Sequence, residues 1–242
     1  MGNVFGFSTE TATGEFTAIL KYDARAGRLF RIDRVDTGGG FENDPVDITA
    51  EFKAIFDFEN VEVGWIDFVA GSAPHCVLVK MGEALPPRPS DRHKNGVRFL
   101  VKLAKTCVGP TGKAIREVMG TAKVFLNGVE TVYKAYLLEK DKNPGKLPVI
   151  ALEKTTPIKS GSGERTSTNY QPNFKIVSWA PRGDLVFTPK AGSAAAAANG
   201  NGNGNGALPL EEKTPPATGS TRVSPPKAKA KEPEATDAED FG

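Results

Sequence analysis

The stretch GVRFLVKLAKTCVGPTGKAIREVMGTAKVFLNGVETVYKAYLL, residues 96–138, holds the two local patterns that decide the fold. From 97 to 103 apolar residues alternate with polar ones, which is the period of a strand with one buried face. From 121 to 138 the apolar residues recur at helical spacing. Thr121 is the expected cap of this helix, and the Asn-Pro-Gly sequence at 143–145 is the expected stop. The stretch therefore predicts an amphipathic helix that packs on a sheet.

Strand patterns flank this stretch on both sides. The segments rich in β-branched and aromatic residues are RLFRIDRV (28–35), EFKAIFDF (51–58), VEVGWIDFV (61–69), HCVLVKM (75–81), GVRFLVKLA (96–104), KLPVIALEK (146–154) and NFKIVSW (173–179). Residues 21–34 read as a hairpin around Ala26 and Gly27. The order of several strands, one helix and two strands with a long polar loop between them favours a mainly β, OB-like fold. An OB-fold is a partly open, five-stranded Greek-key barrel, here with the helix between its third and fourth strands. A β-sandwich with one helix fits the same order.

Composition divides the chain into three parts. Residues 1–190 read as one globular domain, 191–231 as a disordered linker of Ala, Asn-Gly, Pro and Lys, and 232–242 as an acidic tip. No apolar run approaches the roughly 18 residues of a spanning helix, and the first residues lack the pattern of an export signal. We therefore expect a cytoplasmic protein without membrane contact, in which Cys76 and Cys107 are thiols.

Charge is distributed unevenly along the chain. Residues 1–87 hold 7 Lys and Arg against 14 Asp and Glu, whereas residues 88–190 hold 19 against 8. A local excess of positive charge attracts phosphates. The second half of the domain is therefore the expected nucleic-acid-binding part.

Two basic stretches supply the candidate binding residues. In 88–123 the alternation predicts that Arg98 and Lys102 share the outer face of a half-buried strand. In 153–179 a polar, basic loop lies between two strands, with aromatic residues that could stack on bases. The expected nucleic-acid-binding residues are Arg88, Arg92, Lys94, Arg98, Lys102, Lys105, Lys113, Arg116, Lys159, Arg165, Tyr170, Lys175 and Trp179. A solvated charged face explains the first stretch equally well, and core burial remains the alternative for Trp179.

Motifs for catalysis or cofactors are not found. The sequence GPTGKA at 109–114 has two residues between its glycines and Ala after the Lys, whereas a phosphate-binding loop has four residues and then Ser or Thr. The four soft ligands His75, Cys76, His93 and Cys107 match no zinc spacing, and no G-x-S-x-G elbow occurs. The sequence predicts a protein without catalytic residues, metal or cofactor.

The last eleven residues, EPEATDAEDFG, carry five acids, no Lys or Arg, and Phe241 next to last. This end resembles that of the single-stranded DNA-binding proteins of bacteria and of T7-type phages, in which an OB-fold is followed by a flexible linker and an acidic, aromatic-tipped tail. The resemblance implies a domain that coats single strands in replication and recombination. It also implies that the tip recruits partner proteins through Asp237, Glu239, Asp240 and Phe241, within a bacterial host cell if the gene is a phage gene.

The functional expectation is therefore sequence-independent binding of single-stranded DNA, by a chain that could also form a homo-oligomer. A β-rich structural or assembly protein of a phage-like particle is the alternative from another class. Single-stranded RNA binding uses the same stacking and charge chemistry and differs in contacts to the 2′-hydroxyl. The acidic tip is further expected to compete with nucleic acid for the basic residues at low salt.

Overall fold

A computed structural model describes residues 17–70, 73–161, 166–189 and 241 of the chain. This part is mainly β, as the sequence predicts. Its strands are β1 (Ile19–Asp23), β2 (Arg28–Asp36), β3 (Phe41–Asp47), β4 (Lys53–Phe56), β5 (Glu62–Asp67), β6 (His75–Lys80), β7 (Lys94–Leu103), β8 (Ile115–Gly120), β9 (Lys146–Ser160) and β10 (Ser167–Pro181). Its helices are α1 (Lys105–Val108), α2 (Lys123–Glu139) and the single 3₁₀ turn η1 (Lys140–Lys142).

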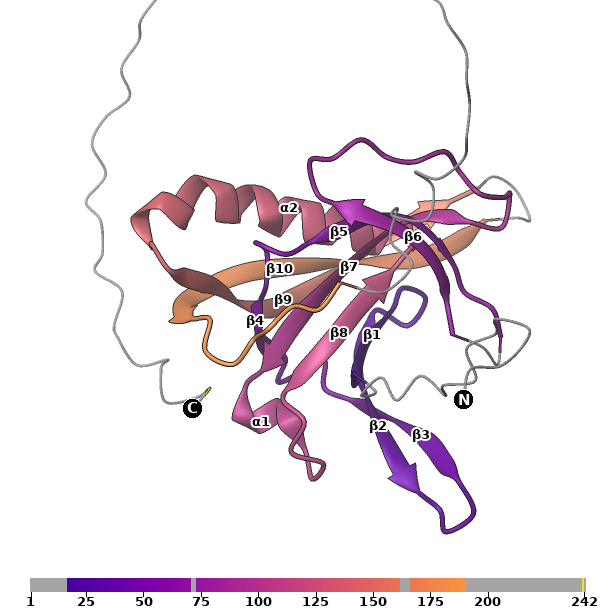
Figure 1. Ribbon diagram of the computed structural model, residues 1–242, viewed down its shortest axis with the longest axis horizontal. Helices are drawn as coiled ribbons and strands as arrows, with labels where there is room; N and C mark the ends of the chain where they lie inside the picture. The colour runs from indigo at the N-terminus through magenta and orange to yellow at the C-terminus, as the bar shows by residue number, and fades with distance from the viewer. Residues whose placement is uncertain (1–16, 71–72, 162–165, 190–240, 242) are drawn as a thin grey trace, which may run out of the picture.

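The strands form one mixed sheet in the order β10-β9-β4-β7-β8-β1-β2-β3, and β5 with β6 continues beside β7 (Figure 1). Only β1 and β8 pair in parallel. One end of the row, β10, approaches the β1–β2 turn, because the backbone N–H of Tyr170 on β10 donates to the carbonyl of Ala24 in that turn. The Tyr22 hydroxyl donates in turn to the Tyr170 carbonyl at 2.7 Å. The curled sheet encloses the main core.

Strand alternation places one face of each central strand in this core. Phe99 and Val101 of β7 are completely buried there, beside Phe56 of β4. Phe56, Phe58 and Phe174 meet edge to face, with ring centroids 5.5 and 5.7 Å from Phe56. Aromatic pairs in this geometry contribute about 0.5–1.5 kcal/mol each beyond the area they bury.

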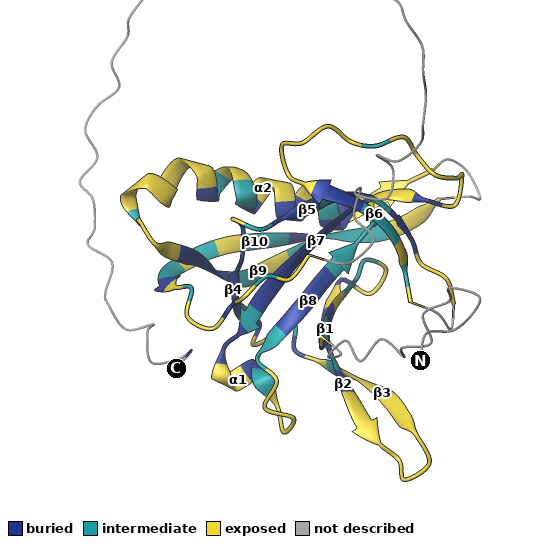
Figure 2. Cartoon of the chain, in the orientation of Figure 1, coloured by how far each residue is buried: buried dark blue, intermediate teal, exposed yellow. Residues whose placement is uncertain are grey.

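Helix α2 covers one side of the sheet with its apolar stripe (Figure 2). Val124, Phe125, Val129, Val132 and Tyr136 are the buried residues of the stripe. The helix is confirmed, but its expected cap is wrong. Ala122 is the N-cap and makes no side-chain capping hydrogen bond.

The described residues form ten strands in one mixed sheet, whereas the sequence indicated seven strand segments and an OB-like barrel of five strands. The predicted hairpin at 21–34 is confirmed as β1 and β2, with Gly27 at φ 67° in the turn. Strands β3 and β8 were not predicted, and the loop expected between 154 and 173 is largely strand, because β9 and β10 each run for fifteen residues. The outer half of this pair, which we call the arm (152–160 and 167–174), pairs only with itself. Most of its residues are polar and exposed or half-buried, so the alternation used for prediction is weak there, although Leu152 and Phe174 at its base pack on the main core.

A second, smaller core lies on the opposite face of the sheet. The segment 182–189, which we call the strap, crosses β4 and β7 there. Arg182 anchors it with hydrogen bonds of 2.8 and 2.9 Å to the Asp57 carboxylate, which raises the pKa of Arg182. Leu185 of the strap is fully buried against Ile55 and Leu100. Among the described helices, none has the length and apolar composition needed to span a membrane.

Candidate nucleic-acid interface

The basic run at 88–116 is divided by strand β7. The ten residues of this strand span roughly 30 Å at about 3.3 Å per residue. Arg88, Arg92 and Lys94 therefore lie at one end of the strand, and Lys105 and Lys113 lie at the other, where both are exposed. The run does not form one continuous surface.

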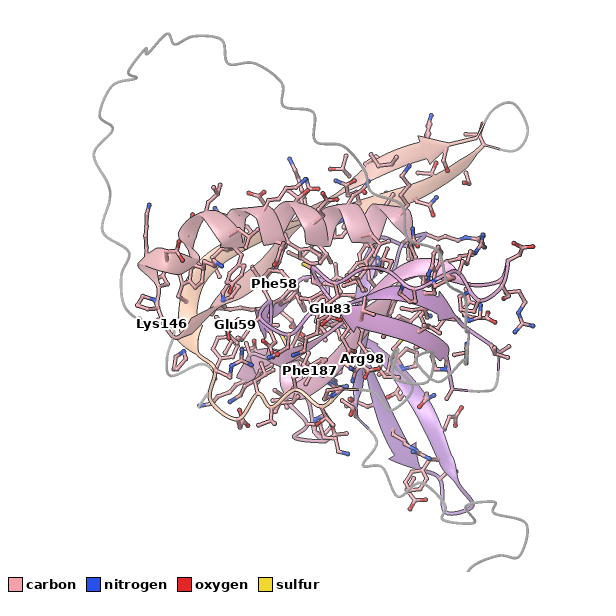
Figure 3. All side chains as sticks on the ribbon, turned by 45° about the horizontal axis from the view of Figure 1, so that its top comes forward. Phe58, Glu59, Glu83, Arg98, Lys146 and Phe187 are labelled. Carbon is pink, nitrogen blue, oxygen red and sulfur yellow. The ribbon has the colours of Figure 1, made fainter. Side chains whose placement is uncertain are left out.

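Arg98 was expected on the exposed face of this strand, and that expectation is wrong. Its side chain is buried between two carboxylates, with Nη1 2.6 Å from Glu62 and Nε 2.8 Å from Glu117. Burial opposes the charge, but the two carboxylates more than offset it and raise the pKa of Arg98. Phe187 of the strap lies 5.0 Å from its guanidinium, and the two side chains are neighbours in Figure 3. Arg98 is thus a structural ion-pair residue and not an exposed cation.

Arg116 is buried as well. It is 0% exposed and bonds Asp33 through Nη2 at 2.7 Å, while Nη1 donates to the Ile32 carbonyl at 2.8 Å. Arg31 shares the same carboxylate at 2.8 Å. Burial lowers the pKa of Arg116, although Asp33 partly compensates. This cluster ties β2 to β8 and leaves Arg116 inaccessible to phosphate.

The Lys102 side chain is only partly exposed to solvent. Its ammonium lies 2.9 Å from Asp184 of the strap, and this hydrogen bond lowers the pKa of Asp184. Only 16% of the Lys102 side chain is exposed. Lys102 therefore fixes the strap to β7.

The residues before β7 surround an aromatic ring that sequence reasoning missed. Trp65 of β5 is half-buried, and its indole N–H donates to the Pro86 carbonyl at 2.8 Å. The guanidinium of Arg88 lies 5.7 Å from the ring centroid. Exposed Arg92 bonds buried Asp67 at 2.6 Å, and Lys94 is exposed. The sequence analysis placed Trp65 only within the predicted strand 61–69, and its position beside Arg88, 23 residues away, had no local signal.

The arm carries the second set of candidates. In the arm Tyr170 pairs with Pro157 and Thr168 pairs with Lys159, so the alternation along each strand places Lys159 on the same face as Tyr170. Tyr170 is half-buried, and its Cβ packs against Gly27. Lys175, at the base of the arm, is exposed. Arg165 lies outside the described residues.

The two aromatic residues expected to stack on bases, Trp179 and Tyr170, lie in different surroundings. Trp179 is half-buried against the main core, with its ring centroid 5.9 Å from that of Tyr136, so core packing is the alternative that holds. Tyr170 lies on the same face of its strand as Phe174, and Trp65 lies on the same face of its strand as Val63. Because Phe174 and Val63 pack on the main core, Tyr170 and Trp65 extend the core-facing side of the sheet. In Figure 1 the arm extends to the upper right, and the segment before β7 arches over the top of the sheet and descends on the same side. We call Trp65, Arg88, Lys94, Lys159 and Tyr170 the rim.

The acidic tip is described only at its aromatic residue. Asp237, Glu239 and Asp240 lie outside the described residues. Phe241 is 6% exposed and packs in the second core.

Soft ligands come together only as a pair. His75 and His93 approach to 2.7 Å between ring nitrogens, and His93 Nδ1 lies 2.8 Å from the Ser90 hydroxyl. Within the described part of the chain, no three His, Cys, Asp or Glu side chains form a possible metal-binding group.

Comparison of the chain with protein-family models, with curated proteins and with solved structures found no match.

Proposed function

We propose that the protein binds single-stranded DNA without sequence preference, with the rim as the contact surface. The observation that carries the proposal is the placement of two half-buried aromatic residues beside exposed cations, Trp65 of β5 beside Arg88 and Tyr170 of β10 on the same face as Lys159. Base stacking on aromatic rings tolerates any sequence because every base has a π-face. Cations beside such rings bind the phosphates between successive bases.

The strand order supports an OB-like arrangement for this surface. When β4 and β5 are taken together as the first strand, the order β10-β9-β4-β7-β8 with α2 between β8 and β9 follows the OB plan. The connections β5–β7 and β9–β10 then correspond to the two loops that hold oligonucleotides in OB-folds. The β1–β3 hairpins are additions to that plan.

The assembly alternative needs a surface that joins copies. β3 is the last strand of the sheet order, and its residues are mostly exposed. However, it carries Pro45 and the carboxylates of Glu42, Asp44 and Asp47. Proline and charges on an edge strand oppose pairing with another chain. The edge therefore gives less support to assembly than the rim gives to nucleic-acid binding.

Charge reversal at two rim lysines tests the proposal. Lys94→Glu with Lys159→Glu is expected to weaken binding of a dT oligonucleotide about tenfold or more at low salt, and to flatten the plot of log K against log salt by about 1.4, or roughly 0.7 per lost phosphate contact. Fluorescence anisotropy at several salt concentrations measures both effects. A matching oligo(U) titration separates a DNA-binding protein from an RNA-binding one.

The other end of β7 provides the matched control. Lys105→Glu with Lys113→Glu changes charge equally but acts roughly 30 Å away, beyond the screening length of about 10 Å. Its affinity should stay within about twofold of the unmodified chain. Equal weakening by both double variants would refute a localised interface.

Trp65 is expected to report on bound bases directly. The chain has two tryptophans, so a Trp179→Phe variant leaves Trp65 as the sole indole emitter. A saturating oligonucleotide should quench this emission, and Trp65→Leu should lower affinity by about 1–3 kcal/mol, the typical contribution of one stacked base. Unchanged emission at saturation would remove Trp65 from the contact surface.

A further inference from the structure

Phe241 occupies an apolar site made by the outer face of the sheet. Leu100 alternates on β7 with core-facing Phe99 and Val101, and therefore points to the other side of the sheet. Ile55 on β4 does the same, and both residues are nonetheless almost fully buried. The residues that share this site with Phe241 are Ile55, Leu100, Ala104, Leu147, Val149, Ala180 and Leu185, with Ile115 and Phe187 packed alongside.

The cover over this face comes from two separate parts of the chain. The strap contributes Leu185 and is fixed by ion pairs at Arg182 and Asp184. The other part is Phe241, which follows 51 residues (190–240) that lie outside the described part. This number of residues is sufficient to return to the sheet, since a random coil of 51 residues has a root-mean-square reach of roughly 5–6 Å × √51, or about 40 Å.

We propose that this site, which we call the tip site, is a docking site for an acidic peptide whose next-to-last residue is aromatic, and that Phe241 of the same chain fills it in the resting protein. The tip site lies among the second half of β7, the first half of β9 and the end of β10, whereas the arm is the opposite half of the β9–β10 pair. Figure 1 shows the yellow end of the chain beside the α1 end of the sheet. Docking at the tip site therefore leaves the rim uncovered, in contrast to the expectation that the tip competes with nucleic acid for the basic residues. Its anchor is the apolar contact of Phe241.

The test compares full-length chains with Phe241 present or absent. A fluorescent peptide of residues 232–242 is titrated into the unmodified protein and into Phe241→Ala. The peptide should bind Phe241→Ala and bind the unmodified protein at least about tenfold more weakly, because a tethered tip competes at an effective concentration in the millimolar range. The same peptide with Ala at position 241 should bind neither protein, since an aromatic anchor dominates such small interfaces.

Additional variants and conditions locate the peptide-binding site and test its chemistry. Adding Leu185→Ala to the Phe241→Ala chain should weaken peptide binding, whereas adding Phe68→Ala, an exposed apolar residue outside the tip site, should not. Raising NaCl from about 50 to about 500 mM should change peptide affinity only about threefold or less, since apolar contact is little screened.

Equal binding to both chains, or binding to neither, would overturn the proposal. Sedimentation tests whether the tip docks on its own chain. If the unmodified protein were a dimer and Phe241→Ala a monomer, the tip would dock on a second copy, and docking within one chain would be overturned. The unmodified protein and Phe241→Ala should bind an oligonucleotide with the same affinity. A failure of the proposed single-strand binding can therefore be distinguished from a failure of tip docking.

Discussion

Replacing Arg98 by methionine is expected to lower the free energy of unfolding by about 3–5 kcal/mol, because it leaves the buried carboxylates of Glu62 and Glu117 without their counter-charge. Arg98 also holds the strap through Nη2, which donates to the Thr188 carbonyl at 3.2 Å. At roughly 2–4 °C per kcal/mol for a domain of this size, the melting temperature should fall by about 10 °C. Urea unfolding followed by circular dichroism measures the change.

Two companion variants identify the cause. Combining Arg98→Met with Glu62→Gln and Glu117→Gln should recover much of the lost stability, since the uncompensated charges are then removed. Arg28→Met breaks the exposed pair with Asp47 and should cost less than about 1 kcal/mol. A single Arg98 variant as stable as the Arg28 variant would show that the buried pairs contribute little.

Replacing Gly128 by valine is expected to destabilise the protein by roughly 3 kcal/mol through overpacking between α2 and β10. A Cβ at this position would lie 2.5 Å from the Pro172 carbonyl oxygen, which is backbone and cannot rotate away. Alanine in place of glycine favours a helix by about 1 kcal/mol. In Gly128→Ala this gain in helix propensity opposes the clash of the added Cβ with Pro172. We expect the clash to dominate, with a smaller loss for alanine than for valine.

The neighbouring position controls for helix propensity. Asn127 is exposed on the same turn, and Asn127→Ala should be neutral or slightly stabilising in the same urea titration. If Gly128→Val were as stable as the unmodified chain, the close approach of α2 to β10 would not contribute to the fold.

Local pattern was sufficient for the elements with one buried face. Helix α2 and strands β2, β4, β5, β6 and β7 coincide with predicted segments within a few residues. It was insufficient for β3, for β8 and for the arm. The arm pairs with no other strand and is mostly polar, and β8 has the sequence IREVMG, in which the buried residues include Arg116 and Glu117, so neither shows regular alternation of apolar and polar residues. Strand partners of this kind are recognised through pairing, which a linear pattern does not contain.

The candidate site shows the same division. The excess of positive charge after residue 88 is a property of the sequence, but exposure of each cation is not. Arg98 and Lys94 belong to one strand and look alike in the sequence, yet the first is buried by Glu62, 36 residues away, and the second is exposed.

The sequence by itself determined that the described domain is β-rich with one amphipathic helix, because burial of alternate side chains is written in the order of residues. Only the tertiary structure decided which cations are exposed, that Trp65 lies beside Arg88, and that Phe241 packs on the sheet's outer face. These contacts join residues far apart in the chain, and their free energy depends on burial and charge partners that exist only once the strands have paired.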